Sequence, residues 1–190
     1  MTRRPLRSSA ADPWLARPPR AQVPPRLRPW LTDPGSLTAR IRARCENFRV
    51  EVVRQARVRP QVDEARALGL PLRQRVWLRE VMLVADGVPV VYARSVLPAR
   101  ALRGPWHLCR GIGARPLGAA LFSDPRVARG PLHCARLDRR NARYHRAVRA
   151  LGSRLALPPA LWARRSVFER QARALLVSEI FLPTLLDLAP

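Results

Sequence analysis

The 190-residue sequence predicts an α+β domain, because two β-hairpin patterns alternate with short segments of helical pattern. The first hairpin joins two apolar, β-branched runs, residues 76–85 and 88–98, at Asp86 and Gly87. This dipeptide is among those that most favour a two-residue turn between strands. The second hairpin pattern spans residues 161–183. Hairpins join neighbouring strands, so an antiparallel sheet is expected.

The first hairpin predicts an anion site on the sheet. If Asp86 and Gly87 form the turn, paired positions have a constant sum, and Arg79 faces Arg94. Two adjacent guanidiniums repel each other and are costly to desolvate, so an anion or a carboxylate is expected beside them. The alternative is that one arginine extends to the edge of the sheet and stays solvated. Side chains alternate between faces, so the pair should share its face with apolar residues: Trp77, Val81, Leu83, Val90, Tyr92 and Val96.

The second hairpin adds a carboxylate to this picture. In its final strand Glu179 alternates with Leu175, Val177 and Phe181, and it is the only acid in that apolar run. An inward carboxylate needs a cation or a proton. Because Arg79 and Arg94 are the outstanding cations of the same kind, we expect one acid and two guanidiniums to meet in a mostly apolar pocket.

Residues 1–29 are expected to form a disordered extension. They hold seven prolines, seven arginines and one acid, Asp12, and bury too little apolar surface to offset the entropy of ordering. A polybasic tether for an anionic membrane surface is the functional alternative. The folded domain is expected to occupy residues 30–190.

The remaining elements follow from local patterns. Asp33 or Ser36 is expected to cap a short helix that ends near Cys45, and Pro116 to begin a second short helix. Periodicity favours Leu117 and Phe122 as ordinary core residues. Further elements are a strand at 48–54, a surface connection at 57–71, a helical segment at 99–108, a strand at 131–137 and a basic helical insertion at 138–159 whose charges face water.

Charge and cysteine content narrow the classes of function. The net charge is +23, but all 36 basic residues are arginine, which points to a coding bias, and no nucleic-acid-binding motif accompanies them. We expect only opportunistic binding to polyanions.

Cys45, Cys109 and Cys134 are widely spaced, which favours free thiols in a reducing compartment and matches no zinc site. Without an apolar run of roughly 18 residues or a signal-peptide core, a soluble, cytoplasmic protein is expected.

Several segments together resemble the chorismate pyruvate-lyase family. They are residues 76–80 with Ala85-Asp86-Gly87, Pro116-Leu117-Gly118 with Leu121-Phe122, and residues 161–166 through 179–183, which cover the chain from about Trp30 to Pro183 in the family's order. The resemblance implies a single α+β domain: an antiparallel sheet of about six strands, with helices and flaps covering an internal ligand pocket. It also implies conversion of chorismate to 4-hydroxybenzoate and pyruvate at the entry to ubiquinone synthesis, by a monomer without metal or other cofactor.

The resemblance also assigns roles to residues. Arg79 is expected to bind the ring carboxylate, and Glu179 to lie at the opposite end against the ring hydroxyl. The main chain at Leu37 is expected to help hold the carboxylate, and Leu117 to contact the ring from a flap. Arg94 matches an arginine of the second hairpin strand and is expected to be a further substrate contact.

Two other functions remain open from the sequence. Effector domains of some transcription regulators share the lyase-like fold and bind small ligands without turning them over, but they normally follow a winged helix-turn-helix, for which residues 1–29 are too short and too rich in proline. A basic nucleic-acid-binding protein is suggested by charge alone.

Overall fold

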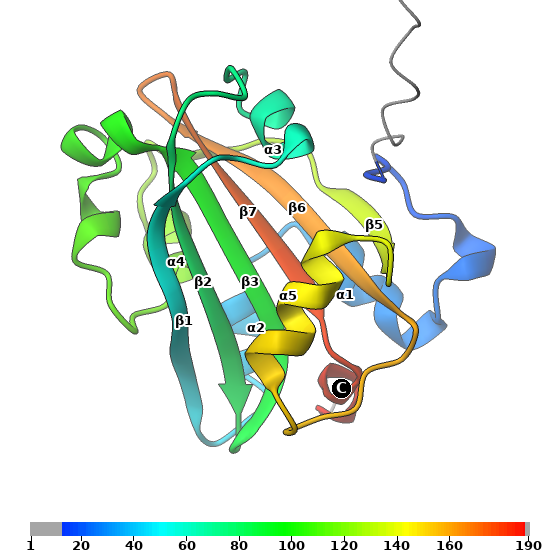
Figure 1. Ribbon diagram of the computed structural model, residues 1–190. Coiled ribbons are helices and arrows are strands. Elements are labelled where there is room, and N and C mark those ends of the chain that lie inside the picture. Colours follow the sequence, from blue (N-terminus) through cyan, green and yellow to red (C-terminus); the bar gives the residue numbers. More distant parts are fainter. Residues whose placement is uncertain (1–12, 189–190) are drawn as a thin grey trace, which may run out of the picture.

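The computed structural model describes residues 13–188, which form one α+β domain around a seven-stranded antiparallel sheet (Figure 1). The strand order is β1-β2-β3-β7-β6-β4, and β5 also pairs with β6. This confirms the predicted fold class. The strands are β1 (Phe48–Val58), β2 (Val76–Ala85), β3 (Val88–Pro98), β4 (Ala128–Arg129), β5 (His133–Asp138), β6 (Ala160–Arg170) and β7 (Arg173–Phe181).

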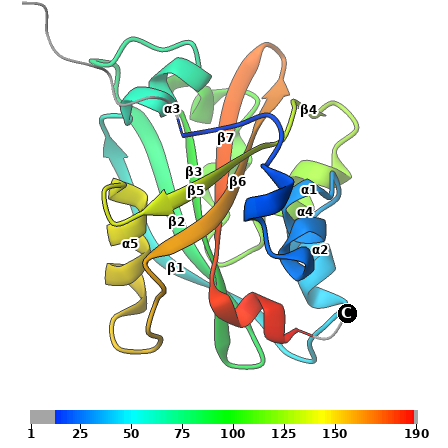
Figure 2. The same ribbon diagram turned by 90° about the vertical axis from the view of Figure 1, so that its right-hand side faces the viewer.

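Helices cover both faces of the sheet (Figures 1 and 2). Helix α5 (Ala142–Leu151) lies on one face, and α1 (Arg28–Thr32), α2 (Leu37–Arg42) and α4 (Leu117–Ser123) lie on the opposite face. Helix α3 (Val62–Ala67) packs near one end of the strands. Short 3₁₀ helices are found at Arg20–Gln22, Pro25–Leu27, Ala99–Arg103, His107–Arg110 and Pro183–Asp187.

The first hairpin has the predicted turn but a different register. Asp86 and Gly87 have positive φ angles of 47° and 82°, as a two-residue hairpin turn requires. Ala85 pairs with Val88, but Leu83 pairs with Val91, so Val90 is an extra residue on β3. Pro89 has no N–H to donate to the ladder, and prolines in sheets are found at such bulges.

This bulge reverses the faces of β3 relative to the prediction. Because side chains alternate, one extra residue moves every later side chain to the other face. Arg79 pairs with Ser95, whereas Arg94 pairs with Glu80. The prediction that Arg79 and Arg94 face each other is therefore wrong. The prediction that Tyr92 and Val96 lie on the same face as Arg79 is wrong for the same reason.

Arg94 instead belongs to an ion-pair network on the face covered by α5. It is 1% exposed, binds Glu64 at 2.6 and 3.1 Å, and binds Glu80 at 2.7 Å. Arg143 of α5 donates to the same Glu64 and to Asp63. Burial alone would raise the pKa of Glu64, but the hydrogen bond and charge of Arg94, with the charge of Arg143, hold this pKa below its usual value.

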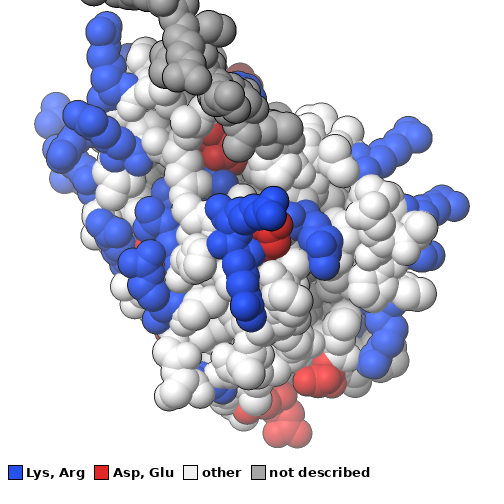
Figure 3. Space-filling view, turned by 45° about the vertical axis from the view of Figure 1, so that its right-hand side comes forward, with Lys and Arg blue, Asp and Glu red and all other residues white. Residues whose placement is uncertain are grey.

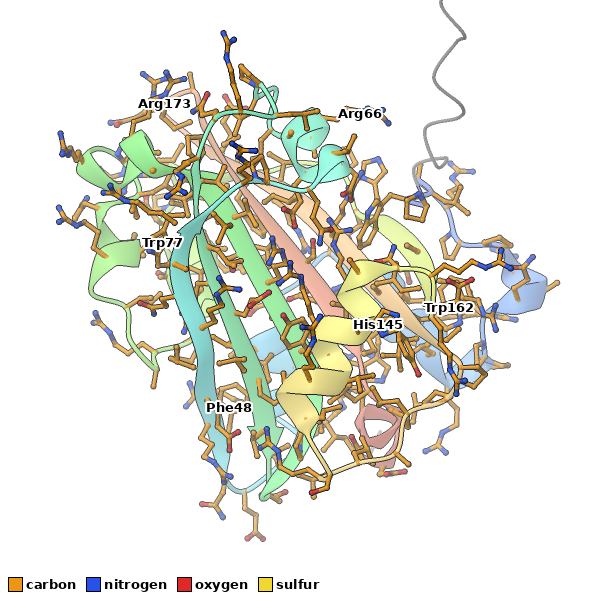
Figure 4. The ribbon with its side chains drawn as sticks, viewed as in Figure 1. Phe48, Arg66, Trp77, His145, Trp162 and Arg173 are labelled. Atoms are coloured by element: carbon orange, nitrogen blue, oxygen red, sulfur yellow. The ribbon has the colours of Figure 1, made fainter. Side chains whose placement is uncertain are left out.

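Helix α5 differs in part from its predicted role. The expected basic helix is present and lies in front of the sheet, with His145 on it (Figure 4). However, Arg143, Tyr144, Ala147 and Leu151 are buried, so the expectation that all its charges face water is wrong for Arg143.

The chain before α1 packs on the domain over residues 13–29, unlike the disordered segment expected there. Trp14, Val23 and Leu27 are buried, and Leu15 forms a β-bridge with Cys134. Trp14 also donates its indole N–H to Asp63, 2.8 Å away. Order thus begins well before Trp30, and residues 1–12 lie outside the described part of the chain.

Arginine side chains project from many parts of the surface visible in Figure 3 and do not gather on one element there. Within residues 13–188 no helix is both long enough and apolar enough to cross a membrane.

We predict that Arg94→Met lowers the free energy of unfolding by about 3–5 kcal/mol, because it leaves Glu64 and Glu80 buried with less compensation. Urea unfolding at pH 7 measures the loss. The control is Arg49→Met, which removes an ion pair whose arginine side chain is 57% exposed, and should cost less than about 1 kcal/mol. Equal losses for the two variants would show that the buried network does not stabilise the sheet.

Candidate active site

A pocket lies between the sheet and helices α2 and α4, on the face opposite α5. Its walls are mostly apolar, and its charged lining residues are three arginines and one glutamate. The lining residues are Leu37, Thr38, Val50, Arg79, Val81, Leu83, Ala93, Ser95, Pro116, Leu117, Gly118, Leu121, Phe122, Arg129, Arg164, Ser166, Phe168, Val177 and Glu179.

Arg79 enters the pocket from β2 and is 2% exposed. Its Nη2 donates to the main-chain oxygens of Gly113 and Arg115, at 2.8 and 3.0 Å, in the loop before α4. Its buried Nε has no acceptor among the described residues. Burial lowers the pKa of this guanidinium. A buried donor without a partner costs about 1–3 kcal/mol, so Arg79 favours an anionic ligand.

Glu179 and Arg164 form an ion pair on the neighbouring strands β7 and β6. The Arg164 Nε lies 2.6 Å from Glu179 Oε2, and the two residues are directly opposite in the ladder. Arg164 is 1% exposed, and its Nη1 also donates to the oxygens of Trp30 and Asp33, at 2.8 and 2.9 Å. It therefore orients Glu179 and holds the chain that leads into α2.

Arg129 of β4 is the third arginine of the pocket. Its Nε donates to Ser166 Oγ at 3.1 Å, and its Nη1 donates to the main-chain oxygens of Pro34 and Gly35. The guanidinium lies 5.4 Å from the ring centroids of both Phe122 and Phe168, a cation–π geometry. Burial, and secondly the charge of Arg164, lower the pKa of Arg129.

Two short helices cover the pocket and touch each other. Of the two predicted caps, Asp33 and Ser36, it is Ser36 that caps α2 by accepting from the N–H of Ala39, and Leu37 follows it at the pocket wall. Leu117 begins α4, with Pro116 before it. The helices meet where Gly118 faces Thr38, so closely that a Cβ at Gly118 would lie 2.9 Å from Thr38 Oγ1.

The structure brings together four of the five predicted site residues: Arg79, Glu179, Leu37 and Leu117 all line the pocket. Arg94 does not, because the bulge places it on the opposite face, bound to Glu64 and Glu80.

Sequence reasoning missed Arg164 and Arg129. The second hairpin turns at Gln171 and Ala172, which have positive φ angles of 49° and 54° although neither is Gly, Asn or Asp. Given that turn, the constant-sum rule places Arg164 opposite Glu179, as observed. The partner of Glu179 was therefore hidden by an unusual turn sequence. Arg129 lies on a two-residue strand, for which no periodic signal exists.

The pocket contains no recognisable metal-binding arrangement. No group of three His, Cys, Asp or Glu side chains that could hold a metal ion occurs within residues 13–188. Cys109 is buried, and burial raises the pKa of its thiol to about 12, with the nearby Arg79 opposing that rise.

The structure is an α+β domain with a mostly apolar pocket in which arginines outnumber acids. Two solved structures share the fold: a GntR-family transcriptional regulator from Bacillus cereus (10% identity, TM-score 0.52, 73% of this chain and 93% of that chain) and one from Enterococcus faecalis V583 (11% identity, TM-score 0.51, 72% and 90%). These identities are so low that the likeness concerns the fold alone.

Sequence relatives specify the family. A sequence model of the family described as chorismate lyase matches residues 11–189. A probable chorismate pyruvate-lyase from Aromatoleum aromaticum is 64% identical over 94% of this chain and 96% of that protein, and one from an Azoarcus species is 61% identical over 95% of each. The chain belongs to the chorismate lyase family and is an enzyme of the lyase class.

We predict that Gly118→Ala loosens the contact between α2 and α4. The added methyl meets Thr38, and strain of about 1 kcal/mol or more raises amide exchange in both helices at least about fivefold. Hydrogen–deuterium exchange measures this change.

The control for this prediction is the same substitution in a Thr38→Ala background. Without Thr38 Oγ1 the strain disappears, and alanine's higher helix propensity should slow exchange in α4 instead. The same sign of effect in both backgrounds would contradict a steric contact between these two residues.

Proposed function

We propose that this protein converts chorismate to 4-hydroxybenzoate and pyruvate. The observation that carries the proposal is Arg79, buried in an apolar pocket with a free Nε donor. The family supports the same reaction, since close relatives carry the name chorismate pyruvate-lyase. A carboxylate on Arg79 would pair with a desolvated guanidinium, which is a stronger interaction than the same pair in water.

The pocket suggests how the ring is oriented. Arg79 projects from β2 and Glu179 from β7, which is two strands away in the sheet. Glu179 lies two residues along β7 from Val177, the residue level with Arg79. A ring with its carboxylate on Arg79 would direct the substituent on its far side toward Glu179. Leu37 and Leu117 would enclose the ring from the two covering helices, and the closed space would hold it in one orientation.

The reaction requires little of the protein beyond orientation and proton handling. The ring carbon that bears the hydroxyl loses its proton, and that electron pair forms the new ring double bond. The bond between the neighbouring ring carbon and the ether oxygen breaks, and the enolpyruvate that leaves takes up a proton to become pyruvate. Aromatisation drives the step. We assign Glu179 to the hydroxyl end of the substrate, where a positioned carboxylate can assist proton transfer.

Ligand binding without turnover is the competing function, since the fold also occurs in transcription regulators. The lyase is favoured because relatives that cover nearly the whole chain at more than 60% identity carry the lyase name.

The cellular setting follows from the family resemblance and is part of the proposal. The product would enter ubiquinone synthesis, and the enzyme would act in the cytoplasm as a monomer.

Addition of chorismate to the purified protein should produce 4-hydroxybenzoate and pyruvate in equal amounts, measured by absorbance and by a coupled pyruvate assay. Glu179→Ala should lower kcat at least about 100-fold, the scale of acid–base assistance, with an unchanged circular dichroism spectrum. Failure of the wild-type protein to form product would refute the lyase function, and full activity of the variant would remove Glu179 from the mechanism.

Arg79→Ala should weaken 4-hydroxybenzoate binding about 10–100-fold, because a charge-assisted hydrogen bond contributes about 1.5–3 kcal/mol. Isothermal titration calorimetry measures this loss. Arg54→Ala on the exposed edge strand β1 is the control and should bind normally. An unaltered product affinity in Arg79→Ala would show that the carboxylate lies elsewhere.

A further inference from the structure

The charges of the pocket do not balance. Three guanidiniums line it, those of Arg79, Arg129 and Arg164, against the single carboxylate of Glu179. Arg164 pairs with that carboxylate at 2.6 Å. Among residues 13–188, Arg79 and Arg129 form no ion pair with a carboxylate, and their hydrogen bonds go to main-chain oxygens and to Ser166. The pocket therefore has two cations in need of anions.

These two cations lie at opposite ends of the pocket. One row across the sheet runs from Arg79 on β2 through Ser95 and Val177 to Ser166 on β6, to which Arg129 is bonded. Three steps between strands separate the ends of this row, roughly 14 Å between main chains. Glu179 lies on β7, next to β6, two residues along from Val177 and on the same face of the sheet. Arg129 thus belongs to the same end of the pocket as Glu179.

The proposed substrate has two carboxylates at matching ends. One is attached to the ring, and the other is carried by the enolpyruvyl ether, on the ring carbon next to the one that bears the hydroxyl. If Arg79 holds the ring carboxylate and Glu179 faces the hydroxyl, one of the two rotations of the ring about this axis directs the ether side chain toward β6. We propose that Arg129 binds the carboxylate of this side chain. This proposal rests on the proposed function, and it assigns the leaving group its own subsite.

Arg129 is built to hold an anion in a fixed place. Its Nε and Nη1 are engaged, whereas its Nη2 has no acceptor among the described residues. The guanidinium also lies within cation–π distance of Phe122 and Phe168, and together these contacts restrict the side chain before any ligand binds. A second carboxylate there would give the substrate dianion an interaction that the product monoanion lacks.

The test compares two unreactive ligands in the intact protein by isothermal titration calorimetry: 4-hydroxybenzoate, with one carboxylate, and 3-(carboxymethoxy)-4-hydroxybenzoate, which adds a second carboxylate on the ether position. Arg129→Met should weaken the diacid at least about tenfold and 4-hydroxybenzoate less than about threefold. Arg129→Lys keeps the charge and should recover part of the lost diacid affinity.

The matched control is Arg126→Met, three residues earlier, whose side chain is 67% exposed; both ligands should bind it as they bind the wild-type protein. An equal loss for both ligands in Arg129→Met would make Arg129 only an anchor for the chain at Pro34 and Gly35, and unchanged binding of both would exclude it from the site. Either result overturns the proposal. Because the ligands are unreactive, a lack of chorismate turnover would refute the proposed function without altering this comparison.

Discussion

A buried guanidinium must find acceptors for its donors and an anion for its charge, and this requirement organises both faces of the sheet. Arg79, Arg94, Arg143, Arg164, Arg165 and Arg170 are all less than 10% exposed. On the α5 face, acids from α3 and β2 form ion pairs with the buried Arg94 and Arg143. These pairs make a structural network. Among the described residues that line the pocket, Glu179 is the only acid, and we infer that this excess of guanidiniums favours an anionic ligand.

The same arginines connect the sheet to the segments that close the pocket. Arg79 holds the loop before α4 through two main-chain oxygens, and Arg164 and Arg129 hold the chain before α2 through four. Neither covering helix is longer than seven residues, too short to be stable alone, so these contacts help to fix the covers over the site. The arginines that would attract an anionic ligand are thus the same ones that hold the covering helices in place.

The sequence was sufficient for the hairpins, the turn at Asp86 and Gly87, a helix capped by Asp33 or Ser36, and the inward direction of Glu179, because each depends on local patterns. It was insufficient where one residue changes the outcome. The bulge at Val90 moved Arg94 to the other face, and the turn at Gln171 and Ala172 lacks the residues that mark such turns. The packing of residues 13–29 was missed, because isolated buried residues such as Trp14 are anchored by contacts distant in sequence.

We propose that Arg79 and Glu179 lie at the two ends of one ring-binding site. A crystal structure of the protein with 4-hydroxybenzoate tests this most directly. We expect the carboxylate within hydrogen-bonding distance of Arg79 Nε, which has no acceptor among the described residues, and the hydroxyl directed toward Glu179. A ring bound in the reverse direction, with its carboxylate on Arg129, or bound outside the pocket would contradict it.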